Sequence, residues 1–168
     1  MARREAEGIQ NADFMVLDAA GPRAGELLLE RLGPANIFVR GVFHVLKPGK
    51  QAAMAANLRT VIGDRGRVLL AETNFRGSSL GYLAELGASR RSMPLQLQRA
   101  LENLPRPGHF GARERHSVFL DSEWQLIADG PVDIEVVPLN SSGISQWVPG
   151  YYALLSGAED SRTEHERV

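Results

Sequence analysis

The amino-acid sequence predicts an α/β fold built on a largely parallel sheet, and two observations carry this prediction. Short apolar runs alternate with helical stretches over the first part of the chain, which is the pattern of βαβ units with right-handed crossovers. The runs stay apolar through their middles, as strands covered on both faces do. With 168 residues, of which 43% are hydrophobic, the chain is large enough for one domain with its own core.

After a short helix at Met1–Glu7, three strands and two longer helices are expected in the first half of the chain. The second helix is the clearest, because its apolar residues fall at i, i+4, i+7 and i+8 and form one stripe (Met54, Leu58, Val61 and Ile62). Gly63 follows as its natural end. The expected elements are the strand Phe14–Leu17, the helix Pro22–Leu32, the strand Asn36–Val42, the helix Lys50–Ile62 and the strand Arg67–Glu72.

The second half is predicted to add helices and two late strands. The helical pattern covers Arg76–Leu104 and, more weakly, Phe119–Ile127, whereas Asp133–Leu139 and Tyr151–Leu155 are expected as strands. Residues 156–168 carry almost no apolar side chains, which is typical of a disordered tail. The chain is therefore expected to hold one domain over residues 1–155, followed by that tail.

Composition excludes several kinds of function. The 19 basic and 20 acidic residues give a net charge of −1, so neither nucleic acid nor an anionic membrane is expected as a partner. The absence of cysteine excludes disulfides, thiolate zinc sites and cysteine nucleophiles. No segment has the roughly 20 apolar residues of a membrane helix, and a cytoplasmic location is expected. His109 and His116, with Glu114 between them, lack the helical spacing of a metal motif, so no metal site is predicted.

Candidate site residues follow the predicted strands, because ligands of open parallel sheets bind beyond the carboxyl ends of the strands. Asp18 can accept a hydrogen bond from an adenine amino group, or it can cap the turn before the next helix. Gly41 can allow close approach of a ligand or simply form a turn. Arg40 can fix a carboxylate or be a solvated charge. His44 can act in catalysis, although a lone histidine is more often structural.

Glycine-rich phosphate loops are missing from the sequence. No two glycines are separated by a single residue, so there is no G-x-G and no G-x-G-x-x-G. The G-x-x-x-x-G-K-[ST] loop is missing as well. We therefore find no segment in this sequence that would cradle a phosphate group.

Several segments, in their order along the chain, resemble the class I S-adenosylmethionine-dependent methyltransferases. Asn36–Leu46 (Asn-Ile-Phe-Val-Arg-Gly-Val-Phe-His-Val-Leu), Ala55–Arg59 and Val61–Glu72 are similar to the middle of such an enzyme. Pro149–Leu155 resembles the family's last strand, and the start of the chain, from Met1 to Asp18, resembles its second helix and third strand.

The resemblance implies a Rossmann-like parallel sheet with an antiparallel C-terminal strand. The family's strand order is 3-2-1-4-5-7-6, and the first two strands and the glycine loop have no counterpart in this sequence. The chain is accordingly expected to be an N-terminally truncated form of the family's domain.

The resemblance also implies the function, which is methyl transfer from S-adenosyl-L-methionine to a small-molecule acceptor by in-line displacement. The segment at Arg40 is not N-P-P-Y-like, which argues against methylation of a base or amide nitrogen. The residues implied are Asp18 and Ala19 at the adenine, Arg40, Gly41 and Val42 at the methionine part, Phe43 and Asn74 at the acceptor, and His44 in catalysis.

Two alternatives stay open. The chain can be a catalytically inactive methyltransferase-like remnant that acts as an interaction module, with its open sheet edge paired in a homodimer. It can also be a fragment of a nicotinamide-dependent oxidoreductase, which shares the sheet, but the segment Arg40–Leu46 speaks against this reading.

Overall fold

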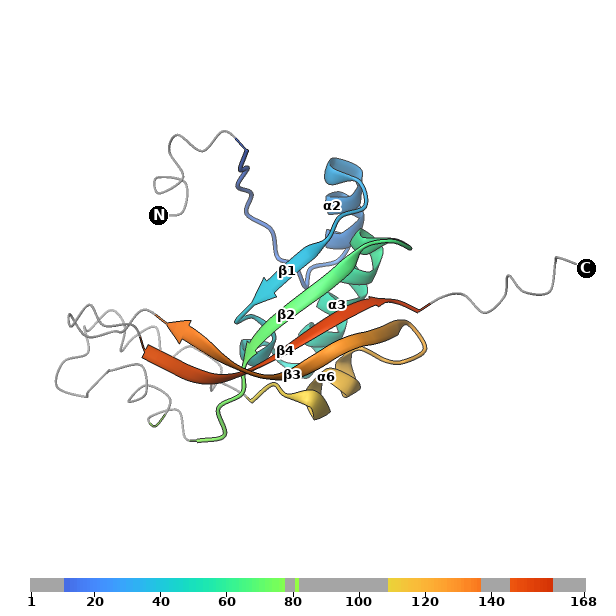
Figure 1. The fold of residues 1–168 in the computed structure, drawn as a ribbon. Coiled ribbons are helices and arrows are strands. Elements are labelled where there is room, and N and C mark those ends of the chain that lie inside the picture. Colours follow the sequence, from blue (N-terminus) through green and yellow to red (C-terminus); the bar gives the residue numbers. More distant parts are fainter. Residues whose placement is uncertain (1–10, 78–80, 82–108, 137–145, 159–168) are drawn as a thin grey trace, which may run out of the picture.

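A computed structural model describes residues 11–77, 81, 109–136 and 146–158 of the chain (Figure 1). In these ranges four strands form one sheet, and helices pack against it. The elements are α2 (Ala24–Leu32), β1 (Ile37–Arg40), the 3-10 helix η1 (Phe43–Val45), α3 (Pro48–Ile62), β2 (Arg67–Thr73), α6 (Ala112–Val118), β3 (Trp124–Val136) and β4 (Gln146–Gly157).

The sheet has the strand order β1-β2-β4-β3. β1 and β2 are parallel, with Val39 opposite Leu70, and the loop–helix connection between them includes α3. β4 runs antiparallel to both of its neighbours. This order matches strands 4-5-7-6 of the expected sheet, so the predicted mixed α/β fold with an antiparallel C-terminal strand is confirmed. Within the described sheet, β1 is an edge strand.

The core lies between the sheet and the helices, on one face of the sheet (Figure 1). The predicted apolar stripe of α3 is buried there as expected (Met54, Leu58, Val61 and Ile62). Aromatic rings fill the space toward α6, because Phe43 lies 5.3 Å from Phe110 and 5.2 Å from Phe119 between ring centroids. Phe119 in turn meets Trp124 edge to face, a geometry that aromatic pairs favour.

The segment Phe14–Leu17, expected as a strand, does not form one. It runs outside the described sheet without regular structure, and the side chain of Val16 is 99% exposed. An ion pair between Asp13 and Arg31 joins this segment to α2 instead. An apolar run becomes a strand only where a neighbour offers a hydrogen-bonding ladder, and in the described sheet β1 pairs with β2 alone.

The region after Phe119 also differs from the prediction. The segment Phe119–Ile127 is not helical, because α6 ends at Val118 and β3 begins at Trp124. β3 continues to Val136 and so includes the start of the strand expected at Asp133–Leu139. This strand begins at Trp124, earlier than predicted. Buried Trp124 and half-buried Leu126 alternate with exposed neighbours, which is the periodicity of a strand.

β4 contains the predicted strand Tyr151–Leu155 and extends to Gly157, where a tail was expected from residue 156. The predicted helix Arg76–Leu104 falls almost entirely outside the described residues, as do the helix expected at Met1–Glu7 and residues 159–168. Among the helices that the structure describes, none combines the length and apolar character needed to cross a bilayer.

Candidate functional site

The turn after β1 depends on Gly41. Its φ of +67° lies in the left-handed region, which glycine adopts without the strain that other residues meet. Its N–H donates to the carbonyl of Ala71 at 2.9 Å, so the parallel pairing with β2 continues one residue past the strand. Near the position of a Cβ on Gly41, the structure places only the Cε1 atom of His44, at 3.6 Å. The outer side of this turn is therefore open.

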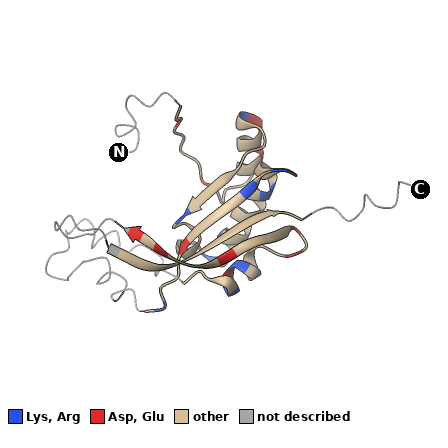
Figure 2. Cartoon of the chain, viewed as in Figure 1, with Lys and Arg blue, Asp and Glu red and all other residues tan. Residues whose placement is uncertain are grey.

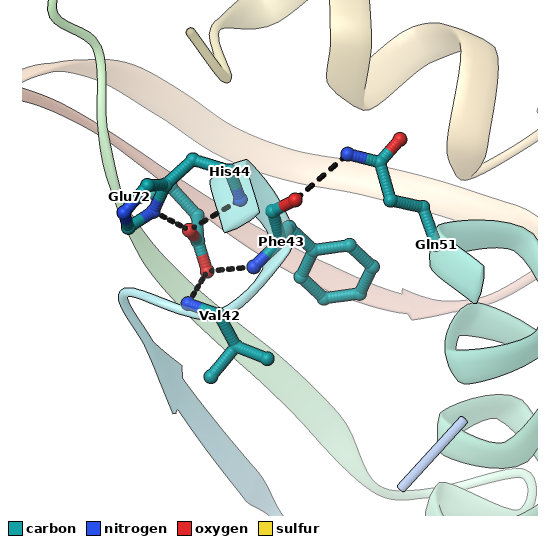
Figure 3. A network of polar contacts seen from close by, with 5 residues as sticks. All are labelled: Val42, Phe43, His44, Gln51 and Glu72. Carbon is teal, nitrogen blue, oxygen red and sulfur yellow. Dashed lines mark hydrogen bonds and ion pairs between the residues drawn. The ribbon is translucent and has the colours of Figure 1, made fainter. Parts of the chain in front are cut away.

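A buried carboxylate holds the loop that follows (Figure 3). Glu72 has no exposed surface, and its Oε1 atom accepts the backbone N–H groups of Val42 and Phe43, both at 3.0 Å. Its Oε2 atom accepts the backbone N–H of His44 at 3.2 Å and contacts the Nδ1 atom of the same residue at 2.8 Å. A buried carboxylate is tolerated only when such donors surround it, and here the donors come from one short loop.

The contact with Glu72 fixes the histidine ring. A carboxylate only accepts hydrogen bonds, so Nδ1 of His44 carries the hydrogen and Nε2 has the lone pair in the neutral ring. His44 is 8% exposed, and its ring lies beside the turn at Gly41. On the other side of the loop, Gln51 of α3 donates to the carbonyl of Phe43 at 2.7 Å (Figure 3). The loop is thus anchored to both β2 and α3.

Asp18 lies in a turn that is also anchored to α3. Its Oδ1 atom accepts the N–H of Ala20 at 3.0 Å, and its Oδ2 atom accepts Nζ of Lys50 at 3.1 Å. The hydrogen bond from Lys50, followed by that from Ala20, lowers the pKa of Asp18 below 3.8. Asn57 binds the carbonyls of Ala19 and Gly21. The turn-capping role considered for Asp18 is what the structure displays, and contact with adenine stays a prediction.

Asp18 and the His44 loop are brought to the same end of the sheet by adjacent residues of α3. Lys50 binds the carboxylate of Asp18, and Gln51 binds the carbonyl of Phe43 in the His44 loop. The structure therefore places Asp18, expected at the adenine, and the loop at Gly41, expected at the methionine part, at the same end of the sheet. Asp18 precedes α2, whereas the loop follows β1. The side chains of two other predicted residues, Arg40 and Phe43, point away from this end of the sheet.

The side chain of Arg40 lies on the opposite face of the sheet from the helices. Strand alternation buries Val39 in the core and sends Arg40 outward, where its guanidinium donates to the carbonyl of Glu135 in β3. It borders an open, mostly apolar cleft of about 490 Å³ together with Phe38 and Trp147. Phe43 is completely buried among the core aromatic rings, so its ring is shielded from any ligand.

Asn74 follows β2 and borders a second cavity, of about 500 Å³. Its N–H donates to the carbonyl of Pro149 at 2.9 Å, which fixes its backbone beside β4. Its Oδ1 atom is buried without a hydrogen-bond partner. The cavity is also bordered by polar side chains that the sequence did not single out as site residues (His109, Glu114, Asp129 and Tyr151).

A polar chain of contacts forms the wall of this cavity between β3 and β4. The hydroxyl of Tyr151 donates to Asp129 at 2.6 Å, and Nε of the buried Arg115 donates to that hydroxyl at 3.4 Å. Burial, followed by the hydrogen bond to Asp129, raises the pKa of Tyr151 to about 12. The phenol therefore stays neutral at physiological pH and acts as a fixed donor.

The structure identifies Glu72 as the main residue that sequence reasoning did not assign to the site. A signal for it was present, because a glutamate that closes an apolar, buried strand needs donors around its carboxylate. The donors could not be named from the sequence, since they come from a loop about 30 residues away. In the described ranges, no three histidine, aspartate or glutamate side chains are grouped so as to hold a metal ion.

Solved structures share this fold. The chain aligns with an S-adenosylmethionine-dependent methyltransferase from Anabaena variabilis ATCC 29413 (TM-score 0.69, 22% identity, 92% of this chain and 64% of the other). It also aligns with a structure concerned with the conversion of a disulfide bond into a thioacetal group during echinomycin biosynthesis (TM-score 0.64, 18%, 95% and 62%). A third is the PH0226 protein from Pyrococcus horikoshii OT3 (TM-score 0.56, 16%, 94% and 65%).

These likenesses show that the fold is of the methyltransferase type, a Rossmann-like sheet with an antiparallel last strand. Sequence identity of 16 to 22% speaks for the fold alone. The chain spans less than two-thirds of the length of each of these neighbours. No protein-family model and no curated protein sequence matches the chain.

Proposed function

We propose that this chain binds S-adenosyl-L-methionine at the carboxyl end of β1 and takes part in methyl transfer to a small-molecule acceptor. The observation that carries the proposal is the loop after Gly41, whose backbone is held by the buried carboxylate of Glu72. Ligands of open α/β sheets bind at this end of the strands. The methyltransferase-type fold and the turn at Asp18, on the same end of α3, support the same assignment.

The residues present fit part of such a cofactor. The open outer side of Gly41 leaves the backbone accessible. The side chain of Asp18 is 67% exposed, so its carboxylate faces solvent. S-adenosyl-L-methionine, when bound, supplies a methyl group on a positively charged sulfur. Because the sequence has no G-x-G, other residues have to hold the amino-acid part of the cofactor.

His44 has the geometry of a positioned proton acceptor. Glu72 accepts a hydrogen bond from Nδ1–H, which leaves the lone pair of Nε2 available. Nε2 can take a proton from the hydroxyl or amine group of a methyl acceptor. The same contact holds the ring against the turn at Gly41. Glu72 contacts no expected ligand directly, so its role is to position His44 and the loop backbone.

Titration calorimetry of the 168-residue chain with S-adenosyl-L-methionine tests the proposal. We expect micromolar binding, about −8 kcal/mol, and at least tenfold weaker binding for Gly41→Ala. Gly33→Ala is the matched control, because Gly33 also has a positive φ, +71°, but lies at the end of α2 with open space around it. Binding that is absent, or equally weak in both variants, contradicts the proposed site.

A second candidate function is favoured by the uncovered face of the sheet. Phe38 and Trp147 are about 60% exposed there, and the central lengths of β1, β2 and β4 carry no charged residues (Figure 2). Exposed apolar surface next to an edge strand is typical of an interface. In this alternative, the chain is a catalytically inactive methyltransferase-like module, and a second copy covers this face in a homodimer.

Sedimentation equilibrium separates the two candidates. A homodimer through this face predicts a dimeric mass that becomes monomeric in Phe38→Glu, whereas Leu120→Glu, at a comparably exposed position, leaves the mass unchanged. A monomeric chain that binds S-adenosyl-L-methionine contradicts the interaction module. A dimeric chain that binds no cofactor contradicts the enzyme.

A further inference from the structure

We infer that the cavity beside Asn74 binds a small molecule through an ammonium group or a similar cluster of hydrogen-bond donors. This cavity lies where the end of β2, the start of α6 and the middles of β3 and β4 meet. Its volume of about 500 Å³ lies within the range of small-molecule sites. The inference depends on which hydrogen-bonding groups its inner wall presents.

The first of these groups is the amide oxygen of Asn74. It is buried, and it has no hydrogen-bond partner. A buried polar atom without a partner is uncommon, because its lost hydration costs about 1–3 kcal/mol. The hydrogen bond from its N–H to the carbonyl of Pro149 holds the backbone of Asn74 at the cavity wall. An amide oxygen only accepts, and the missing partner is therefore a donor.

The second group is the ring of His109. Its Nε2 atom lies 3.3 Å from the carboxylate of Glu114, so the neutral ring carries its hydrogen on Nε2. Nδ1 then has the lone pair, and this atom is buried without a partner as well. Two unpaired atoms of the same cavity are thus both acceptors.

Both groups border one small space beside Gly111. A Cβ on Gly111 would lie 3.0 Å from Oδ1 of Asn74 and 3.2 Å from Cε1 of His109. The φ of Gly111 is −123°, which any residue can adopt, so backbone strain does not require glycine at this position. Glycine at this position leaves room between the amide oxygen of Asn74 and the edge of the His109 ring that carries Cε1 and Nε2.

The charges around this space also favour a cation. The carboxylates of Glu114 and Asp129 border the cavity and are about 30% exposed. Arg76 and Arg113 border it too, but both are exposed to solvent, where water screens their charge. The buried Arg115 is turned toward Tyr151 and Asp129. The less exposed wall therefore presents acceptors and negative charge.

The binding of a donor group rests on this cavity alone. That the bound molecule is the methyl acceptor, and hence an amine or a molecule that carries one, rests on the proposed function. The two statements are tested separately, because the experiment below contains no S-adenosyl-L-methionine.

The test uses methylammonium chloride as the probe, with sodium acetate and sodium chloride at equal ionic strength as comparisons. In two-dimensional ¹H–¹⁵N spectra of the 168-residue chain, we expect methylammonium to shift the amide signals of Gly111 and Gly130 in a saturable manner. Acetate and sodium chloride are expected to leave these signals in place. Equal shifts with all three salts, or none with methylammonium, overturn the inference.

Variants locate the binding and separate it from general effects. Asn74→Leu removes the buried acceptor, and Gly111→Ala fills the space; each is expected to weaken methylammonium binding about tenfold. His109→Ala is compared with His116→Ala, which removes an exposed histidine of α6 that faces Asp121 instead. Unchanged binding in Asn74→Leu and Gly111→Ala, with folded spectra, contradicts the site.

Discussion

The Oε2 atom of Glu72 lies 2.8 Å from Nδ1 of His44, and this contact joins the end of β2 to the loop after β1. The same carboxylate accepts three backbone N–H groups from that loop. The loop therefore takes its shape from a side chain of the neighbouring strand and from one glycine.

The substitution Glu72→Gln is expected to lower the free energy of unfolding by about 3 kcal/mol. The amide group has one acceptor oxygen in place of two, so buried donors of the loop lose their partner and face an N–H₂ group. Urea denaturation followed by circular dichroism measures the change. Glu123→Gln, at an exposed position, is the control and should stay within about 0.5 kcal/mol of the parent chain. Equal effects of the two variants would show that the loop is not held by Glu72.

Phe119→Ala is expected to lower the free energy of unfolding by about 4 kcal/mol. Phe119 is fully buried and contacts Phe43 and Trp124, so the substitution leaves a cavity between the sheet and α6. Thermal and urea unfolding of the variant test this value. The neighbouring Leu120 is 51% exposed, and Leu120→Ala should change the stability by less than 1 kcal/mol.

The stability difference between the parent chain and Glu114→Gln is expected to disappear at acid pH. Burial opposes ionisation of Glu114, but the N–H groups of Gly111 and of Glu114 itself, with the electrostatic interactions of the carboxylate with His109 and Arg113, outweigh it, and the pKa falls below 4.5. A carboxyl with a lowered pKa in the folded state stabilises the fold above the unfolded pKa, and this contribution is lost as the pH falls through the folded pKa. Urea unfolding at about pH 7 and about pH 3 measures the difference, and an equal difference at both values would contradict the prediction.

Tyr151→Phe is expected to remove the phenol that titrates near pH 12 and to destabilise the chain by about 1 kcal/mol at neutral pH, because Asp129 loses a donor. A raised phenol pKa stabilises the fold fully below the unfolded value near 10, and this contribution is lost as the pH rises toward 12. Ultraviolet titration of the phenolate band follows the ionisation. Tyr152→Phe, at the adjacent and more exposed position, should leave the ionisation of the Tyr151 phenol near pH 12 unchanged.

The sequence predicts those elements best whose pattern is set locally. The stripe of α3 repeats at helical spacing and the run of β2 is apolar through its middle, and both elements form within two residues of the predicted bounds. Phe14–Leu17 has an equally apolar run, but a strand also needs a partner, and pairing is decided by the rest of the fold. Only the part of β3 before Asp133 was not expected as a strand, and the reason is local. Its alternation is interrupted by a register shift at Leu126/Ala128 and by Gly130-Pro131, a pair of residues that favours turns.

The sequence predicts that candidate site residues lie at the ends of the strands, but it does not predict their contacts. The carboxyl ends of β1 and β2 were expected to carry it, and Gly41, His44 and Asn74 lie there. The alternation of side chains along β1 explains why Arg40 lies on the other face. The links from Glu72 to His44, and from His109 to Glu114, join or close loops whose paths the sequence pattern does not determine.

Glu72 and Asn74 are separated by a single residue, Thr73, which pairs with Gly150 of β4. The carboxylate of Glu72, which anchors the histidine loop, and the unpaired amide oxygen of Asn74 therefore belong to one short segment at the end of β2. Two molecules bound at the histidine loop and in the cavity beside Asn74 would keep a fixed distance from each other, because the paired strand β2 joins the two sites. To change that spacing, the chain would have to break the ladder between β2 and β4.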